Sequence, residues 1–597
     1  MKNKRQKLNE FLFVVSIFSG LFLWFSNDVS AATINAISCS YADVSAAITS
    51  ANSGDIVNVP AGTCTWTSQL LITKGISFMG AGVGVTNITF SGSLPAYTRS
   101  FKYLPTDPSA DEVFRMAGFS FDLGDLDDQG IAISNTTEEY ALTKIRIDHN
   151  EFNNPGDITL TINGPIYGVV DNNVFNGGPL QGTHIDNYGQ DTCADWSYFP
   201  ISHGDANNLY YEDNVFNGQY GTLTSCGHGG KYVYRYNNLY TNRPSGSITP
   251  IFDMHGNQTT VPSGSKGGEI YGNEIDNQYV ATGATMIGLR GGEMLAFGNK
   301  LTNFSSGMGS YAREEFDNGI GGCSPLIEQQ IKNTYFWNNR NNGDIISFSG
   351  HPTEAGSIAS AGSSYFIRSS STTSYCTNGC YIYGVRITGG TGAGQFRGVS
   401  SFSGSQVNIT SYTGGTATWD IVPDNTSTYE IVSDCCDNIH PDQEFFEYEA
   451  SFNGTAGVGC GPLANRPETC TPGVGYWATN QSCSTVSDVN VGANPAEPIS
   501  GMLYKCSATN TWTAYYAPYI YPHPFRTDCV GYPALCDNGS ALQGDLNSDG
   551  TVNIFDYNLL LANFGNAECG NVADINVDCT VNIFDYNILL SNFGQSV

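Results

Sequence analysis

The sequence predicts an all-β solenoid followed by a small helical module, and three observations support this fold class. A short strand-like phrase that ends in asparagine recurs seven times between residues 145 and 340. Charged residues make up only 13% of the chain while glycine occurs 69 times, a composition that favours short strands and turns over helices. Residues 543–597 break this pattern, because a phrase with helical spacing of its apolar residues occurs there twice.

The chain begins with a segment typical of a secretory signal. Residues 1–7 are basic, residues 11–25 form an apolar run, and residues 29–31 offer small side chains for cleavage. The run is short for a membrane-spanning helix and nothing similar follows it. We therefore expect residues 1–31 to be the signal peptide of an extracellular protein, secreted or attached to a cell surface, with no membrane span after cleavage. The alternative is an uncleaved N-terminal anchor.

The net charge argues against nucleic acid as a partner. The chain has 25 basic and 55 acidic residues, which gives a formal charge of −30. Nucleic-acid binding depends on Lys and Arg side chains that neutralise phosphates, whereas acidic residues outnumber basic ones in this chain.

All 17 cysteines follow the expected cleavage site. In an exported protein most of them should form disulfides, and because the number is odd at least one is left over. No set of Cys and His residues has convincing zinc-site spacing. The plausible close pairs are Cys376/Cys380, Cys460/Cys470, Cys529/Cys536 and Cys569/Cys579.

The seven repeated phrases, from IRIDHNEF to YFWNN, predict the coils of the solenoid. A recurring strand-and-turn unit of about 20–30 residues is the mark of this architecture. Asparagine tolerates a left-handed corner, and its amide can bond to the asparagine of the next coil. A β-sandwich with Asn-rich turns, the alternative, would not keep the same flanking pattern seven times. The expected corner residues are Asn150, Asn173, Asn214, Asn238, Asn273, Asn299 and Asn339.

Residues 41–66, YADVSAAITSANSGDIVNVPAGTCTW, resemble the capping helix and first strands of the pectate-lyase-like superfamily. The resemblance covers about 35–528 and implies a right-handed parallel β-helix, a fold that hosts lyases, hydrolases, epimerases and adhesins. One interruption, which contains GVRITGGTGAGQFRGVSSF, resembles small β modules of surface and phage tail proteins. The expected domains are the signal peptide 1–31, the parallel β-helix 32–350, an inserted small β module 351–434, a Cys-rich C-terminal part of the β-helix region 435–530, a linker 531–542 and a terminal module 543–597.

A polar residue followed by glycine precedes five of the corner asparagines by about ten residues. In most of the strands before these glycines, large apolar residues alternate with the polar ones, so the polar side chains should point outward. Successive coils lie ~4.8 Å apart, so these residues should form an exposed ladder if no unseen coil intervenes. Asp253 would lie on the same outer face as His255, which follows it by two residues. The polar residues of this register are Asn163, His203, His228, His255 and Arg290, and the expected ladder consists of His203, His228, His255 and Arg290.

This ladder is the candidate catalytic site, because β-helix enzymes usually keep their active groove along the outside of one sheet. His203, His228 and His255 could exchange protons near neutral pH. Asp253 could act as an acid or base or orient a histidine, and Arg290 could bind a uronate carboxylate or a sulfate. The alternative is a set of solvated polar turn residues. Further carboxylates that the sequence does not place are Glu293, Glu314, Glu315 and Asp317.

The duplicated terminal phrase contains two loops with the spacing of calcium sites. Oxygen-bearing side chains stand at loop positions 1, 3, 5, 9 and 12, and position 7 supplies a backbone carbonyl. Position 6 is Gly550 in the first copy but Cys579 in the second, which departs from the pattern. The expected Ca²⁺ ligands are Asp545, Asn547, Asp549, Thr551, Asn553 and Asp556 in the first loop, and Asp574, Asn576, Asp578, Thr580, Asn582 and Asp585 in the second.

A helical pattern that ends in glycine follows each loop, and no helix precedes the first one. Residues 543–597 therefore resemble the type I dockerin module, which implies Ca²⁺ as cofactor and a cohesin-type protein as partner. Partner choice in that family tends to sit just before loop position 12. Here this pair is Ile554-Phe555 and Ile583-Phe584, which departs from the hydroxyl-rich pairs of many cellulosomal dockerins.

Two interpretations of the function follow. In the first, the chain is a secreted, surface-mounted β-helix protein that binds polysaccharide and cleaves it as a lyase or glycoside hydrolase, because dockerin tails most often accompany carbohydrate-active modules. In the alternative it is a non-catalytic cell-surface adhesin or fibre-like protein, which the tail-like insertion and the lack of a complete catalytic set favour. The sequence identifies neither the glycan nor the bond.

Overall fold

The computed structural model describes residues 31–597 with gaps, so almost all of the expected signal peptide lies outside the described residues. The gaps are 93, 95–97, 125–129, 136, 138, 157, 178–184, 189–199, 220–221, 243–249, 257–263, 282–284, 305–308, 313–330, 347–353, 376–382, 394, 411–416, 433–443, 480–482, 484–485, 537–543, 545, 547–551, 567–572, 574, 576–579 and 595–597.

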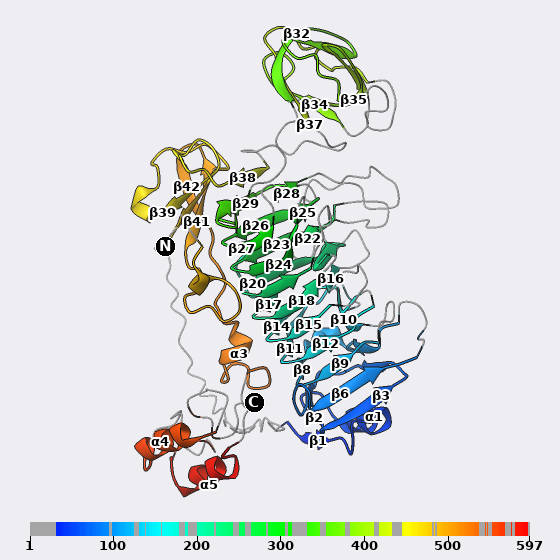
Figure 1. Ribbon diagram of the computed structural model, residues 1–597, viewed down its shortest axis with the longest axis vertical. Helices are drawn as coiled ribbons and strands as arrows, with labels where there is room; N and C mark the ends of the chain where they lie inside the picture. Colours follow the sequence, from blue (N-terminus) through cyan, green and yellow to red (C-terminus); the bar gives the residue numbers. More distant parts are fainter. Residues whose placement is uncertain are drawn as a thin grey trace, which may run out of the picture.

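Three long sheets wind around one another to form a β-solenoid, which confirms the expected all-β architecture with parallel strands (Figure 1). Most coils contribute one strand to each sheet, and the described pairings within the sheets are parallel apart from that of Arg340–Asn341 with Asp344–Ile345. Sheet A consists of β1 (Thr33–Asn35), β2 (Ile56–Val59), β5 (Ser77–Gly80), β8 (Phe114–Ala117), β11 (Leu142–Asp148), β14 (Ile166–Asp171), β17 (Leu209–Glu212), β20 (Lys231–Arg235), β23 (Gly267–Tyr271), β26 (Glu293–Phe297), β29 (Thr334–Trp337) and β38 (Phe445–Glu447).

Sheet B follows sheet A in each coil, and sheet C follows sheet B. Sheet B consists of β3 (Gly62–Trp66), β6 (Thr86–Phe90), β9 (Ser120–Asp122), β12 (Glu151–Asn153), β15 (Val174–Asn176), β18 (Val215–Gln219), β21 (Asn238–Thr241), β24 (Glu274–Ala281), β27 (Lys300–Phe304), β30 (Arg340–Asn341) and β31 (Asp344–Ile345). Sheet C consists of β4 (Leu70–Ile72), β7 (Phe101–Tyr103), β10 (Ile131–Ser134), β13 (Leu160–Asn163), β16 (Ile185–Tyr188), β19 (Thr224–Gly227), β22 (Pro250–Met254), β25 (Thr285–Leu289) and β28 (Gly309–Ala312).

The core of the solenoid is made by side chains that alternate inward along the strands, as their period of two requires. In sheet B the inward column is a stack of phenylalanines, with ring centroids 5.9 Å apart between Phe121 and Phe152 and 4.7 Å apart between Phe175 and Phe216. Helix α1 (Tyr41–Ser50) lies beside the first strands and buries Val44, Ala47 and Ile48. This helix therefore covers apolar side chains that the first coil would otherwise expose.

An asparagine ladder fixes the corner between sheets A and B. The Nδ2 group of each ladder residue donates to Oδ1 of the next one, for example 3.1 Å from Asn173 to Asn214, and also to two backbone carbonyls. The residue before each ladder asparagine has a positive φ of 51–65°. The described ladder residues are Asn150, Asn173, Asn214, Asn237, Asn273, Asn299 and Asn339.

The prediction was wrong at one position of this ladder, because Asn237 and not Asn238 occupies the corner. Leu239 points into the core between Phe216 and Ile275, and in the neighbouring coils the core residue follows the corner asparagine by two positions. Counting back two residues from Leu239 gives Asn237. Asn238 is instead the first residue of β21, and its Oδ1 accepts from the backbone N–H of Ala493.

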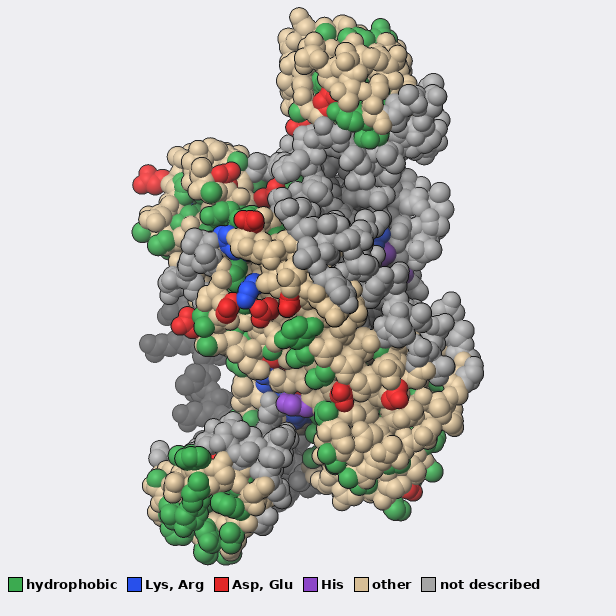
Figure 2. Space-filling model, in the orientation of Figure 1, with side chains coloured by type: hydrophobic (Ala, Val, Ile, Leu, Met, Phe, Trp, Pro, Cys, Tyr) green, Lys and Arg blue, Asp and Glu red, His purple; other side chains and the backbone are tan. Residues whose placement is uncertain are grey.

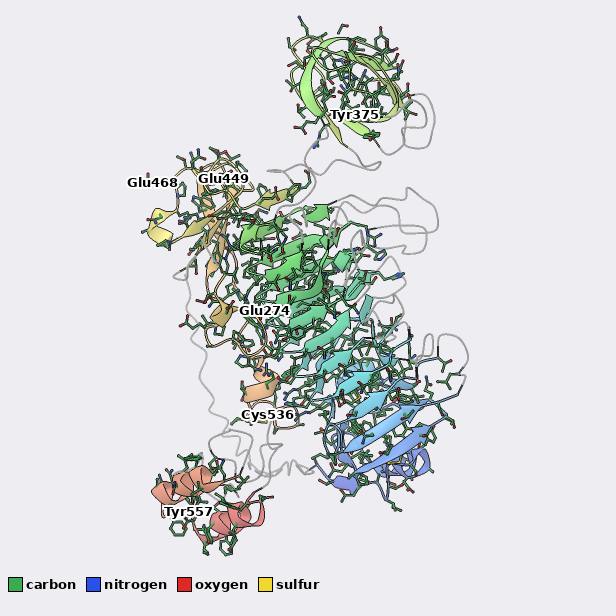
Figure 3. The ribbon with its side chains drawn as sticks, viewed as in Figure 1. Glu274, Tyr375, Glu449, Glu468, Cys536 and Tyr557 are labelled. Atoms are coloured by element: carbon green, nitrogen blue, oxygen red, sulfur yellow. A yellow bond between two sulfur atoms is a disulfide. The ribbon has the colours of Figure 1, made fainter. Side chains whose placement is uncertain are left out.

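Residues 354–432 form a closed antiparallel barrel with a hydrophobic core of its own, at the end of the solenoid far from α1 (Figure 1). Glu354 and Arg368 form an ion pair of 2.8 Å inside it, and Tyr375, labelled in Figure 3, donates to Glu354. The strands are β32 (Glu354–Gly362), β33 (Tyr365–Arg368), β34 (Gly384–Gly389), β35 (Phe396–Ser403), β36 (Gln406–Thr410) and β37 (Thr428–Val432).

A separate layer from the C-terminal half covers the outer face of sheet A. It contains a four-stranded sheet, and its apolar side chains share a second hydrophobic cluster with outward residues of sheet A such as Tyr271, Phe297 and Trp337. Residues 517–536, here named the strap, then run back along sheet A towards its first strands. The four strands are β39 (Val458–Gly461), β40 (Gly475–Ala478), β41 (Met502–Ala508) and β42 (Thr511–Tyr516), and the strap contains the short helix α3 (Pro524–Thr527).

Disulfides support the expectation of an oxidised protein but only part of the expected pairing. Cys529–Cys536 is confirmed, whereas the pair Cys460/Cys470 is wrong. Backbone bonds between Cys470 and Asn510 place Cys470 beside the end of β41, where it bonds Cys506. Cys376/Cys380 and Cys569/Cys579 fall outside the described residues. The disulfides in the described part of the chain include Cys39–Cys64, Cys460–Cys483, Cys470–Cys506 and Cys529–Cys536. Cys226 is buried in the core and takes part in none of these four bonds.

The terminal module contains helices α4 (Ile554–Asn563) and α5 (Ile583–Ser591), which begin at the same place in the two sequence copies. In both, an asparagine caps the helix and an aspartate three residues on completes a capping box. Val552, Leu560 and Leu589 belong to a small core between the copies. No helix within the described part of the chain is long and apolar enough to cross a bilayer.

Candidate functional site

Asp253, His255 and Arg290 come together on the outer side of sheet C. Asp253 lies on β22, and His255 and Arg290 directly follow β22 and β25, which pair in parallel. Arg290 binds Asp253 through two bonds, Nε to Oδ1 at 3.1 Å and Nη2 to Oδ2 at 2.6 Å. Nε2 of His255 lies 3.2 Å from Oδ2 of the same carboxylate. We call these three residues the sheet C triad.

The triad is largely buried, and this determines its electrostatics. The side chains of Asp253, His255 and Arg290 retain 13%, 18% and 12% of their exposed area. Burial acts to raise the pKa of Asp253, but the hydrogen bond and charge of His255 and the guanidinium of Arg290 outweigh it and hold this pKa below its ordinary value. Asp253 is therefore a carboxylate at neutral pH, and it orients the imidazole beside it.

The rest of the expected ladder is not in register with the triad. Gly227, not His228, is the neighbour of His255 in the next coil, since the N–H of His255 donates to the carbonyl of Cys226. His228 follows in a left-handed conformation with φ of 50° and begins the turn towards sheet A. The assignment of His228 to the ladder was therefore wrong, because the chain turns one residue earlier in that coil.

An unrecognised coil explains the misplacement of His203. Sheet C contains β16, which lies between β13 and β19, so Asn163 is followed across the sheet by Tyr188 rather than by His203. Residues 200–203 are not a strand of sheet C, and the loop that contains them leads into β17 of sheet A. The short strand IDNY carries no corner-like phrase, so the sequence pattern missed it.

His203 lies instead among carboxylates on the outer face of sheet A. Its Nδ1 atom is 3.7 Å from Glu269 and its Nε2 atom is 4.0 Å from Glu293. Tyr516 of the covering layer donates to Glu269 at 2.8 Å, and Tyr515 lies 3.4 Å from Glu293. This group is buried under the layer and is not a surface groove. Glu314, Glu315 and Asp317 lie outside the described residues.

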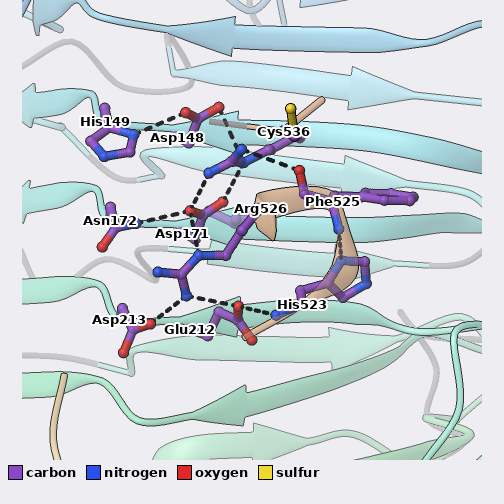
Figure 4. A network of polar contacts seen from close by, with 12 residues as sticks. Asp148, His149, Asp171, Asn172, Glu212, Asp213, His523, Phe525, Arg526 and Cys536 are labelled. Atoms are coloured by element: carbon purple, nitrogen blue, oxygen red, sulfur yellow. Dashed lines mark hydrogen bonds and ion pairs between the residues drawn. The ribbon is translucent and has the colours of Figure 1, made fainter. Parts of the chain in front are cut away.

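A ladder of ion pairs that the sequence analysis missed lies on the same face, under the strap (Figure 4). Arg115 bonds Asp148 through two atoms, at 2.8 and 2.6 Å, and Arg146 bonds Asp171 in the same way at 2.9 and 2.7 Å. Further along, Arg235 bonds Glu212, and the strap contributes His523 and Arg526. The acidic members and Arg235 stand two residues before a ladder asparagine, in the phrases DHN, DNN, EDN and RYN, a signal that could have revealed them.

The expected calcium ligands fall mostly outside the described residues. Asp545, Asn547, Asp549, Thr551, Asp574, Asn576 and Asp578 are among those not described. The position-12 residues Asp556 and Asp585 are fully buried at the starts of α4 and α5. Asp556 accepts from the backbone N–H groups of Leu546 and Asn553, so it ties the loop to the helix in the way a position-12 carboxylate would. No group of three or more His, Cys, Asp or Glu in the described part of the chain has a metal-binding arrangement.

The terminal module exposes the same apolar positions in both copies, and Figure 2 shows hydrophobic side chains gathered on it. Phe555 and Phe584 retain 65% and 63% of their exposed area, and Ile554 and Ile583 retain 53% each. Large exposed apolar patches on small modules commonly mark interaction surfaces. The equivalent pairs are Ile554/Ile583, Phe555/Phe584, Leu561/Leu590 and Phe564/Phe593.

Comparisons with known proteins add nothing to what the strand pairing shows of the architecture. No protein-family model and no curated protein matches the chain. Among solved structures, a protein described as "Geobacillus virus E2 - ORF18" is similar at 17% identity over 64% of this chain and 74% of its own, with a TM-score of 0.23. That score is too low to carry an argument about fold or function. The parallel sheets themselves define the chain as a β-solenoid protein.

Proposed function

We propose that the chain is a secreted, surface-mounted β-solenoid protein that binds polysaccharide along the outside of sheet C and cleaves it, as a lyase or glycoside hydrolase, at the sheet C triad. The observation that carries the proposal is the contact of Asp253 with both His255 and Arg290 on adjacent coils. An imidazole held by a carboxylate is suited to act as a general acid or base.

Within this proposal the three residues have different roles. His255 exchanges the proton, and Asp253 orients the imidazole and stabilises its protonated form. The Nε and Nη2 groups of Arg290 both donate to Asp253, so Arg290 acts as a positioning residue. Arg290 was expected to bind a uronate carboxylate or a sulfate, whereas its bidentate contact with Asp253 favours the positioning role.

The proposal is tested on the full chain with a panel of acidic and neutral polysaccharides. His255→Asn and Asp253→Asn should each lower turnover by about 10²–10⁴-fold while the protein stays folded. His228→Asn is the matched control, since asparagine tolerates the left-handed φ of 50° at that position and His228 is outside the triad. Activity that survives both triad variants would place the site elsewhere. Absence of cleavage and binding on every glycan would instead support the non-catalytic adhesin or structural protein.

We also propose that the terminal module binds Ca²⁺ and docks to a cohesin-type protein. The support is the duplicated exposed pair, Ile554-Phe555 and Ile583-Phe584, which leaves two equivalent apolar faces on one small module. Capture of the full chain by a set of cohesin-type domains should be lost when Phe555→Asp and Phe584→Asp are combined. Val530→Asp is the control, because Val530 is 95% exposed outside the module. Equal capture of the control and the double variant would contradict the assignment.

A further inference from the structure

The strap lies across the coils of sheet A and is held there by buried arginines. Arg235 of β20 donates to the carbonyls of Tyr519 and Ile520 at 2.8 and 2.9 Å. Arg146 of β11 donates to the carbonyl of Leu535 at 2.5 Å. Each of these arginines also binds a carboxylate of sheet A, so one guanidinium group links a coil to the strap.

The first coils hold the end of the strap in the same way. Arg115 of β8 donates to the carbonyl of Cys536 at 2.6 Å and binds Asp148 with its other edge. Cys536 accordingly lies beside the N-terminal coils, as Figure 3 shows. From Arg235 to Arg115 the strap therefore crosses the strands β20, β17, β14, β11 and β8.

His523 sits at the centre of this contact with its ring buried. The residue is 2% exposed, its backbone N–H donates to Glu212 at 2.8 Å, and its Nδ1 accepts from the N–H of Phe525 at 3.2 Å as the cap of α3 (Figure 4). Its Nε2 atom is buried without a hydrogen-bond partner. The ring packs against Tyr210 and Phe525, at centroid distances of 5.3 and 4.6 Å.

Positive charge surrounds this imidazole from three elements. Arg146 of β11, Arg235 of β20 and Arg526 of α3 all act against a positive charge on it, and Glu212 of β17 acts in the opposite direction. Two further carboxylates, Asp171 and Asp213, lie at this contact and are ion-paired with Arg526. Glu212 already binds Arg235, Arg526 and the backbone of His523. A proton on the ring would add a fourth cation to this group and leave a buried N–H without an acceptor.

We propose that the strap is an acid-released clasp: protonation of His523 below neutral pH detaches residues 517–536 from sheet A while the solenoid remains folded. The solenoid does not share this sensitivity, because its coils are held by the asparagine ladder and the apolar core, which contain no titrating imidazole among the described residues. A second histidine, His203, also lies beside carboxylates, those of Glu269 and Glu293. It packs against Tyr516, which precedes the strap in the chain.

The direction in which the pKa of His523 is shifted agrees with this geometry. Burial lowers the pKa of His523 to about 3, Glu212 opposes the shift, and Arg235, Arg146 and Arg526 add to it. The ring in a released strap would have the ordinary value of 6.5. Since the released state then binds the extra proton, each pH unit below about 6.5 favours release by up to about tenfold.

Release would change how far the terminal module can move from the solenoid. A fully extended strap contributes roughly 3.3 Å per residue, so the freed segment of about 20 residues adds on the order of 60 Å of tether. It would also uncover the arginines and carboxylates of sheet A.

Hydrogen exchange of the full chain, followed by mass spectrometry between pH 7 and 4.5, tests the proposal. After correction for the intrinsic rate, amide protection of 517–536 in the wild type should fall about 100-fold, whereas that of β20–β26 should not. His523→Asn and His523→Ser both keep a cap for α3 but cannot titrate, so their straps should lose less than tenfold. His149→Asn is the control: His149 also contacts Asp148 of the network, and the next coil already has Asn172 at the same corner position.

Several results would overturn the proposal. One is a wild-type strap that keeps its protection at pH 4.5, and another is a strap that loses protection only together with β20–β26. A third is an equal pH response in the His523 variants and the wild type. Release of the strap at pH 7 in both His523 variants would show that the ring serves packing rather than switching. None of these readouts depends on activity towards a glycan.

Discussion

Arg290 and Asp253, which are 37 residues apart in the chain, form a two-bond ion pair across adjacent coils of sheet C. Because Asp253 also contacts His255, the position of the imidazole depends on Arg290. Arg290→Ala should therefore lower kcat on any cleaved glycan by about 10–100-fold with less change in KM. It should also reduce the free energy of unfolding by about 1–3 kcal/mol, since it leaves a largely buried carboxylate short of a partner. Arg290→Lys should restore part of the loss, and an unaltered kcat in Arg290→Ala would contradict this positioning role.

The corner between sheets A and B provides a sharp test of register. Asn237 donates to Asn273 and to two carbonyls from a fully buried position, so Asn237→Ala should cost about 1–3 kcal/mol of unfolding free energy. Asn238→Ala, one residue on, removes a single acceptor near the surface and should cost less than about 1 kcal/mol. Denaturant unfolding of the two variants measures the difference. Equal losses would mean that the ladder does not pass through Asn237.

Acid should weaken the fold through the buried carboxylates under the strap. Burial acts to raise the pKa of Glu212, but Arg235 and Arg526 lower it to about 2, from an ordinary 4.5. Because the folded value is depressed, the stabilisation is complete above pH 4.5 and is lost as the pH falls towards 2, by up to about 3 kcal/mol. Glu212→Gln should be less stable at pH 7 and lose less between pH 4.5 and 2. Glu274→Gln, which alters a partly exposed ion pair with Lys300, should keep the wild-type slope.

The terminal module should bind two Ca²⁺ per chain, because each copy repeats the full set of oxygen-bearing positions. Asp556→Asn and Asp585→Asn should each remove one equivalent in calorimetric titrations of the full chain after EDTA treatment. The second loop should be the weaker, since Cys579 replaces the glycine of the tight turn. Stoichiometry that is unchanged in both variants would refute the assignment of these ligands.

The repeat predicted the solenoid correctly because the corner asparagine and the core residue two positions later recur in each coil and are both buried for physical reasons. Six of the seven ladder positions were predicted correctly. The seventh was shifted by one residue, because Asn238 was taken in place of Asn237, although counting back from the core residue Leu239 gives Asn237. The triad followed from strand alternation in β22 and β25. His203 and His228 did not, because β16 has no recognisable phrase and the chain turns at Gly227.

The covering layer could not be predicted from the repeat at all. Its contacts join residues up to 421 positions apart, such as Arg115 with Cys536 and Asp213 with Tyr521, and no local pattern encodes such partners. The charged residues on the outer face of sheet A were not recognised as buried, because the strap that covers them is distant in the sequence. The pairing of Cys470 with Cys506 escaped prediction for the same reason.

Because the strap runs back along sheet A, the two ends of the solenoid carry different domains. The barrel lies at one end of the solenoid and the terminal module at the other, even though the module follows the barrel in sequence (Figure 1). Sheet A has 12 strands, so at ~4.8 Å per coil the rise between its first and last strands is roughly 50 Å. A partner that binds the terminal module would therefore hold the solenoid at one end, and the barrel would lie at the end farthest from the partner.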